Sequence, residues 1–205
     1  MIENNAFFKN NDYNSNTFAG KQLPNHWWSR VYEYHWALKF ANENDICADM
    51  GCGTVHPFVF ALADKCKFVT GVDSNSDIMK LPRKQNLKFL NQDIEKLTID
   101  SESFDKIFCI SVLEHINLDK INNVLYEFYR TLKKNGRLIL TLDICLDKDR
   151  HKANDTWDSI LLSQFFKFIE FTEFNFDGNV STNAYNILKR DKENICIYHA
   201  VLVKK

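Results

Sequence analysis

The segment Asp49-Met-Gly-Cys-Gly-Thr limits what this chain can fold into more than any other. It follows the apolar run 46–48, so it places a carboxylate at a strand's end and two glycines, Gly51 and Gly53, in the next turn. Glycine has no Cβ, so such a turn can approach a ligand closely. A second acid, Asp73, ends the apolar run 68–72. This order of strand, glycine turn, helix and acid-ended strand is typical of half a nucleotide-binding α/β unit.

The bulk composition narrows the class of protein. A chain of 205 residues suits one domain. Its formal net charge is −1 and it has no run of five basic residues, so we expect no DNA partner. No apolar stretch approaches the roughly 18 residues of a membrane helix, and the N-terminus lacks a signal-peptide pattern, so no membrane partner is expected. The six cysteines include no C-x-x-C pair, which favours reduced thiols and a cytoplasmic location.

Strand-like and helix-like runs alternate through the middle of the chain. A proline suits the first turn of a helix, so a helix is expected after Pro57, a short one over 76–81, and a longer one from Leu118 that ends at Asn135-Gly136. The alternation predicts a parallel sheet with helices on both faces. The predicted strands are Ile46–Met50, Phe68–Asp73, Leu87–Leu90, Lys106–Ser111 and Arg137–Asp143.

The N-terminal part predicts a separate unit over residues 1–45. Asparagine is frequent in the leader through Pro24, which we expect to be irregular and mobile. Helical spacing then begins and continues over 25–42, with one apolar face and a second face of Trp28, Tyr32 and Trp36. That second face either packs on the domain or covers a ligand pocket as a lid. The remaining residues, 46–205, are predicted to form the main domain.

The C-terminal part has a different pattern. A helix is predicted over 156–168, followed by two long apolar runs, 169–176 and 195–203. A polar segment containing Asp177-Gly178-Asn179 joins them. We expect these two runs to pair as an antiparallel hairpin at the sheet edge.

Five motifs, in this order and spacing, resemble those of class I S-adenosylmethionine (SAM) methyltransferases. They are Asp49-Met-Gly-Cys-Gly-Thr, Gly71-Val-Asp73, Asn91-Gln-Asp93-Ile, Ser111-Val-Leu-Glu-His115-Ile and Leu132-Lys-Lys-Asn-Gly-Arg-Leu-Ile-Leu140. The resemblance covers about residues 46–142. It implies an α/β, Rossmann-like fold with a mostly parallel seven-stranded sheet, helices on both faces and a C-terminal antiparallel hairpin.

The resemblance also implies SAM as the cofactor and a role for each motif. The Asp49 loop, through Gly51, Cys52 and Gly53, would hold the methionine part near the positive end of the next helix. Asp73 would accept hydrogen bonds from the ribose hydroxyls, with Ser74 beside it. The other implied cofactor contacts are Asp93 for the adenine amino group, Ile94 for the ring, and Ser111 where the cofactor meets its acceptor.

One departure from the family pattern concerns the glycine loop. The family often has a third glycine where Val55 stands, so the loop beyond Thr54 is less securely predicted. The competing cofactor is a nicotinamide or flavin dinucleotide, whose fingerprint G-x-G-x-x-G needs glycine where this chain has His56. A bulky side chain there would impede close packing of helix on strand, which disfavours that reading.

The acceptor site is less readable than the cofactor site. His115 is the candidate catalytic base because its ordinary pKa lies near neutrality, with Glu114 beside it; both could instead serve helix entry and packing. Some relatives, such as ubiquinone O-methyltransferases, hold a metal with Glu-x-x-Glu-His, but Ser111 stands at the first position, so no metal is expected. An Asn/Asp-Pro-Pro-Tyr segment is also missing, which disfavours methylation of DNA base amino groups.

Three functions therefore stand as hypotheses. The first is an enzyme that transfers a methyl group from SAM to a small-molecule acceptor. The second is a SAM-binding module without transfer activity that acts in a complex, and the third is a nucleic-acid methyltransferase. The loop from Asp143 to Trp157 either contacts the acceptor or is simply solvated. The acceptor's identity and the oligomeric state are not readable from the sequence.

Overall fold

The central sheet is built from the apolar strands that the sequence predicts. In the computed structural model, which describes residues 3–13, 16–146, 157–170, 173–183, 186–190 and 194–205, seven strands form its main path. The path runs β1 (Ala6–Phe7), β12 (Ile195–Lys204), β8 (Leu132–Cys145), β7 (Phe104–Ile110), β4 (Ile46–Met50), β5 (Phe68–Asp73) and β6 (Leu87–Asn91). The five strands from β8 to β6 are parallel, whereas β12 and β1 are antiparallel additions. The predicted α/β fold with a mostly parallel sheet is confirmed.

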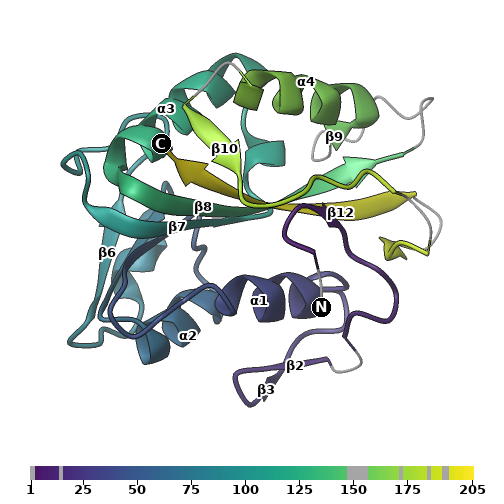
Figure 1. Cartoon of the computed structure of the whole chain (residues 1–205). Helices are drawn as coiled ribbons and strands as arrows, with labels where there is room; N and C mark the ends of the chain where they lie inside the picture. The colour runs from purple at the N-terminus through teal and green to yellow at the C-terminus, as the bar shows by residue number, and fades with distance from the viewer. Residues whose placement is uncertain (1–2, 14–15, 147–156, 171–172, 184–185, 191–193) are drawn as a thin grey trace.

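Helices cover both faces of the sheet. Figure 1 shows α1 (Arg30–Leu38) and α2 (Phe58–Lys65) on one face, and α3 (Ile121–Thr131) and α4 (Ser159–Glu170) on the other. Short 3₁₀ turns follow the strands: η1 (Ser76–Lys80), η2 (Leu113–His115) and η3 (Leu118–Lys120). A small hairpin of β2 (Thr17–Phe18) and β3 (Lys21–Gln22) precedes α1. No helix in the described segments combines the length and apolarity needed to cross a bilayer.

Two apolar layers hold the helices to the sheet. Beneath α3 and α4, Leu125, Phe128 and Phe165 belong to one buried cluster with the sheet. Beneath α1 and α2, Trp36 and Leu62 belong to a second cluster. All six cysteines are buried, and none of them is in a disulfide. Most lie within these layers, where a thiol packs as a small apolar group.

The expectation of an irregular leader is wrong for its described part. Ala6 and Phe7 pair with Tyr198 and His199 of β12, so the leader supplies an edge strand of the main sheet. Phe8 is fully buried against the same layer as Trp36. An apolar pair of residues is enough to place a strand here because β12 already offers an unpaired edge.

On the second face of α1, Trp36 packs against the domain and does not form part of a lid. The Trp36 ring lies 4.5 Å from the His199 ring and 6.0 Å from Phe8, centroid to centroid, and is 1% exposed. A lid role for Trp36 is therefore wrong. The helix is also shorter than the predicted range 25–42, spanning Arg30–Leu38.

Two further boundaries differ from prediction. The helix α3 ends at Thr131, and Asn135-Gly136 lies inside β8, where Asn135 has a φ of 62° and the register with β7 shifts. These residues form a bulge rather than a helix end. The run 169–176 is also not one strand, because α4 continues to Glu170 and only β10 (Phe174–Phe176) pairs antiparallel with β12. Short strands β9 (Trp157–Asp158) and β11 (Lys189–Arg190) complete the sheet.

Replacing Phe128 should test the α3 layer. Phe128→Ala removes a fully buried ring, so the free energy of unfolding should fall by about 3–5 kcal/mol. Tyr126→Ala on the same helix is the control, because Tyr126 is 64% exposed and its loss should cost less than about 0.5 kcal/mol. Urea unfolding measures both; equal effects would contradict this placement of α3.

Candidate functional site

The glycine loop after β4 turns sharply because its two glycines adopt left-handed conformations. Gly51 has a φ of 74° and Gly53 a φ of 61°, a region that side chains rarely adopt. A Cβ on Gly51 would lie 2.5 Å from Val112 Cγ2, so there is no room for one. The amides of Gly51 and Cys52 both donate to the Val72 carbonyl, at 2.8 and 3.1 Å. The loop is thereby fixed against the end of β5.

Asp73, the last residue of β5, binds this loop directly. Its Oδ2 accepts a hydrogen bond from the Gly53 amide at 2.9 Å, and its Oδ1 accepts one from the Asn75 amide at 2.8 Å. Ser74 is exposed between them. One carboxylate therefore joins the ends of β4 and β5, where the sequence predicted a ribose-binding acid.

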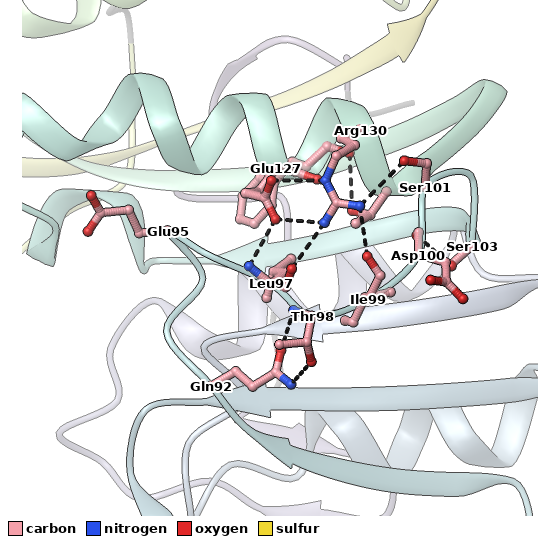
Figure 2. A network of polar contacts seen from close by, with 12 residues as sticks. Gln92, Glu95, Leu97, Thr98, Ile99, Asp100, Ser101, Ser103, Glu127 and Arg130 are labelled. Atoms are coloured by element: carbon pink, nitrogen blue, oxygen red, sulfur yellow. Dashed lines mark hydrogen bonds and ion pairs between the residues drawn. The ribbon is translucent and has the colours of Figure 1, made fainter.

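The loop after β6 carries Asp93 and Ile94, the predicted adenine contacts. Ile94 is buried, while Asp93 is exposed and its Oδ1 accepts from the Glu95 amide at 2.9 Å. Figure 2 shows how the rest of this loop is held from α3. Glu127 accepts from the Leu97 amide at 2.9 Å, and the Arg130 guanidinium donates to the carbonyls of Leu97 and Ile99. The contacts from α3 therefore fix Leu97 and Ile99, in the part of the loop that follows Asp93 and Ile94.

Asp49 lies beneath the glycine loop, at the end of β4. It is 4% exposed, and burial together with the nearby charge of Asp73 raises its pKa to about 8. A cavity of about 50 Å³ opens beside it. The cavity is lined by Arg30, Tyr34, Asp49, Gly51, Cys52, His56, Phe58, Ile110 and Ser111. Asp49, Gly51, Cys52 and Ser111 thus come together, as the sequence predicted.

Sequence reasoning missed Glu33, which links α1 to the sheet. Its Oε2 accepts from Arg30 Nη1 at 2.5 Å and from Ser29 Oγ at 2.9 Å. Its Oε1 accepts from Ser111 Oγ at 2.5 Å and from Thr141 Oγ1 at 2.6 Å. Burial opposes its charge, but Arg30 and these hydroxyls outweigh burial and lower its pKa. A charged residue on the sheet-facing side of a predicted amphipathic helix was the one available signal.

Glu114 and Asp143 extend this polar cluster toward the end of β8. The Asp143 amide donates to Glu114 Oε1 at 3.2 Å, and Asp143 Oδ1 lies 3.2 Å from Ser111 Oγ. Ser111 itself has a φ of 49°, a strained conformation for serine, at the point where β7 ends. His115, the predicted base, is exposed at the end of η2.

His56, which replaces a fingerprint glycine, packs over the glycine loop. Its Nδ1 lies 2.7 Å from the Tyr34 hydroxyl, and its ring centroid lies 4.5 Å from that of Trp27. Burial and the charge of Arg30 lower its pKa to about 4. On its far side is an open groove of about 630 Å³ between the β2–β3 hairpin and α2. His56 and Trp27 form one wall of that groove.

The comparisons with known proteins agree with this geometry. Residues 48–140 match a family described as a methyltransferase domain. Over 104 residues, the chain is 32% identical to a ubiquinone biosynthesis O-methyltransferase of Coxiella burnetii. That match covers 48% of this chain and 44% of the relative, so the chain spans less than half of the relative's length.

Solved structures share the fold over most of the chain. The N-methyltransferase NodS of Bradyrhizobium japonicum, in complex with S-adenosyl-L-homocysteine (SAH), matches with a TM-score of 0.65 and 14% identity. That match covers 85% of this chain and 86% of NodS. Residues 48–140 thus carry a methyltransferase domain, and the chain shares its fold with a solved methyltransferase.

A cyclase of the same fold shows what the fold alone leaves open. The [4+2]-cyclase SpnF matches this chain with a TM-score of 0.69 and 14% identity, covering 100% of this chain and 88% of SpnF. A shared fold can carry different chemistry, so the reaction has to be argued from the site.

The residues of the candidate site fit SAM chemically. The cofactor's sulfonium and ammonium are cationic, and Asp49 offers a buried carboxyl group beside the glycine loop, whose charged form a nearby cation would favour. Its carboxylate is anionic, and Arg30 lines the same cavity. Its ribose presents two hydroxyls as donors. Each Asp73 carboxylate oxygen accepts from one backbone amide and has a second lone pair that could accept from a hydroxyl. Asp49, Arg30 and Asp73 therefore suit the cationic groups, the carboxylate and the ribose hydroxyls of SAM, respectively.

One group of possible metal ligands lies elsewhere. Ligand atoms of Asp45, Cys47 and Cys66 lie within 4.8 Å of one another, at the amino ends of β4 and β5. Asp45 is already paired with the Lys106 ammonium at 2.5 Å. This group is at the opposite end of the strands from the cofactor cavity, so it takes no part in the site.

The raised pKa of Asp49 predicts a pH dependence of stability. Asp49 keeps its proton in the folded protein up to about pH 8, whereas an unfolded aspartate loses it near pH 3.9. Folding therefore loses stability as the pH rises from about 4 to about 8. Asp49→Asn removes this loss. The free energy of unfolding of the variant, relative to that of wild type, should therefore rise by on the order of a few kcal/mol across that range.

Urea unfolding of the ligand-free protein at pH 5 and pH 8 measures this gain. Asp119→Asn, an exposed change in η3, is the matched control and should follow wild type at both pH values. Parallel pH slopes for Asp49→Asn and wild type would show that the Asp49 carboxyl is not buried as described.

Proposed function

We propose that this chain transfers a methyl group from SAM to a small-molecule acceptor at the carboxyl ends of β4, β7 and β8. The observation that carries the proposal is the grouping of the glycine loop, Asp49 and Asp73 at one edge of the sheet. Ligands of doubly wound sheets bind at this edge. The similarity to an enzyme whose name gives a small acceptor supports the acceptor class.

The cofactor roles follow the order of the strands. Asp73 accepts from the ribose hydroxyls and Ser74 lies beside it. Asp93 and Ile94 hold the adenine, and Cys52 supports the loop from below, since it is 2% exposed. Gly51 and Gly53 let the backbone approach the methionine part, and Asp49 faces its cationic groups. Ser111 stands where cofactor and acceptor meet.

The chain's own residues position the reaction, and SAM supplies an activated methyl group. The helix α1 covers the mouth and helps to exclude water. Residues 1–45 act as this cover and residues 46–205 as the methyltransferase domain. The two parts are joined in one sheet, because β1 of the first pairs with β12 of the second. His115 takes the acceptor proton. A formal net charge of −1 supports a small acceptor rather than a nucleic acid. Six cysteines without a disulfide support a cytoplasmic location.

Asp73→Asn tests the cofactor role. The variant replaces a charged acceptor by a neutral one, so SAH affinity should fall by about 1–3 kcal/mol, or roughly 5- to 150-fold. Asp77→Asn is the control because Asp77 is exposed nearby. In the described contacts its carboxylate pairs only with Lys80, and its backbone amide donates a hydrogen bond to Asn75 Oδ1. Calorimetric titration measures both. Equal affinity for Asp73→Asn and wild type would rule out this role.

His115→Ala tests the base. Loss of a general base should lower kcat by about 100-fold or more while SAH affinity stays unchanged. Because His115 is exposed, added imidazole should restore part of the rate. A variant with full kcat, or one whose only defect is weaker SAH binding, would remove His115 from the reaction.

A further inference from the structure

Two carboxyl groups stand beside Ser111 at the end of β8. Asp143 is half-buried, and its Oδ1 lies 3.2 Å from Ser111 Oγ. Glu114 Oε1 accepts from the Asp143 amide at 3.2 Å, so the Glu114 carboxyl lies against the same residue. Ser111 also lines the cofactor cavity. The pair is therefore next to the place where the methyl group would be presented.

The charges of this cluster are not balanced. Arg30 is matched by Glu33 at 2.5 Å, and Glu33 accepts four hydrogen bonds in all. Asp143 has no ion pair within the described part of the chain, although Arg30 acts on it at longer range.

A second observation points to a ligand. Glu114 is 4% exposed, and its Oε2 accepts no hydrogen bond from the residues that the structure describes, although its carboxyl lies within bonding reach of the Asp143 carboxyl. A buried polar atom without a partner costs about 1–3 kcal/mol, so it is expected to meet a complementary group. The complementary group for a carboxyl oxygen is an N–H or O–H donor, and a positively charged donor suits it best.

We infer that the acceptor is an amine, and that Asp143 and Glu114 hold its nitrogen beside Ser111. The inference rests on the proposed function and names the substrate class of that site. The acceptor's N–H groups would donate to the two carboxyl groups, which leaves the nitrogen lone pair directed away from them and toward the methyl group.

Charge movement during the reaction favours an amine. The lone pair of a neutral amine forms the new N–C bond while the C–S bond breaks, and the C–S electron pair stays on sulfur to give SAH. The positive charge passes from sulfur to nitrogen, so carboxylates beside the nitrogen stabilise the transition state. His115, the proposed base, takes one proton from the acceptor ammonium before this step, and the product leaves as the methylated ammonium. An oxyanion nucleophile, as from a phenol, would instead be repelled by the same carboxylates.

The protonation states are consistent with this arrangement. Burial and the charge of Glu33 raise the pKa of Asp143 to about 6, so Asp143 is ionised at neutral pH. Burial and Asp143 raise the pKa of Glu114 well above its usual range, and a positive nitrogen would favour its charged form. The charged groups that face Asp143 in the described chain are Arg30 and Glu33 from α1 and Glu114 from η2. Transfer should therefore decline below about pH 6.

The position of the methyl group tests the inference. Wild-type protein is incubated with labelled SAM and a small-molecule cell extract, supplemented with tyramine and dopamine, which each carry both an amine and phenol groups. Mass spectrometry then locates the label on nitrogen or oxygen. Label on nitrogen is expected. Label on oxygen, or no labelled amine although the protein binds SAH, overturns the inference; failure to bind SAH overturns the proposed function instead.

Variants separate a role at the nitrogen from a structural one. For the labelled amine, Asp143→Asn should lower kcat/KM at least about 10-fold, with partial recovery in Asp143→Glu and SAH affinity within about twofold of wild type. The difference in rate between Asp143→Asn and wild type should shrink below about pH 6, where wild type also loses the Asp143 charge. Asp119→Asn is the control for a lost surface carboxylate. A full rate in Asp143→Asn, or a loss matched by weaker SAH binding or a lower unfolding midpoint, contradicts the inference.

Discussion

The site depends on one buried carboxylate, Glu33, which joins the helix α1 to the ends of two strands. It accepts from Ser111 at the end of β7 and from Thr141 in β8, and it holds Arg30 in place over the cavity. A buried charge is tolerable only when its partners satisfy it, and Glu33 has four donors. Because both hydroxyls come from neighbouring parallel strands, α1 can seat properly only when β7 and β8 are in register. The position of the cover and the position of the reaction centre are therefore set together.

Charge is distributed unevenly along this edge of the sheet. At β5, the half-buried Asp73 carboxylate accepts hydrogen bonds from two backbone amides. At β4, Asp49 is so buried that its pKa rises to about 8. At β8, Asp143 stands outside the Arg30–Glu33 pair. In the proposed function these acids would meet a ribose, a cationic sulfur and an acceptor in turn, an order that suits a ligand whose positive charge moves during the reaction.

Sequence predicted the parallel core of the fold well and its surroundings less well. The strands β4 and β5 have the predicted bounds, because continuous apolar runs with acidic ends define them. Asn135-Gly136 was misread, because a left-handed asparagine before glycine suits a bulge as well as a helix end. The glycine loop and Asp73 were found because their spacing is local. Glu33 was not, since its partner Thr141 is 108 residues away and no local pattern records the contact.

A crystal structure of the protein with SAH tests the central claim most directly. The account predicts that both ribose hydroxyls bond to the Asp73 carboxylate, and that the homocysteine part lies between Arg30, Asp49 and the glycine loop. It also predicts that Glu33 keeps its bonds to Ser111 and Thr141. A complex with SAH bound elsewhere, or with Asp73 turned away from the ribose, would contradict the account.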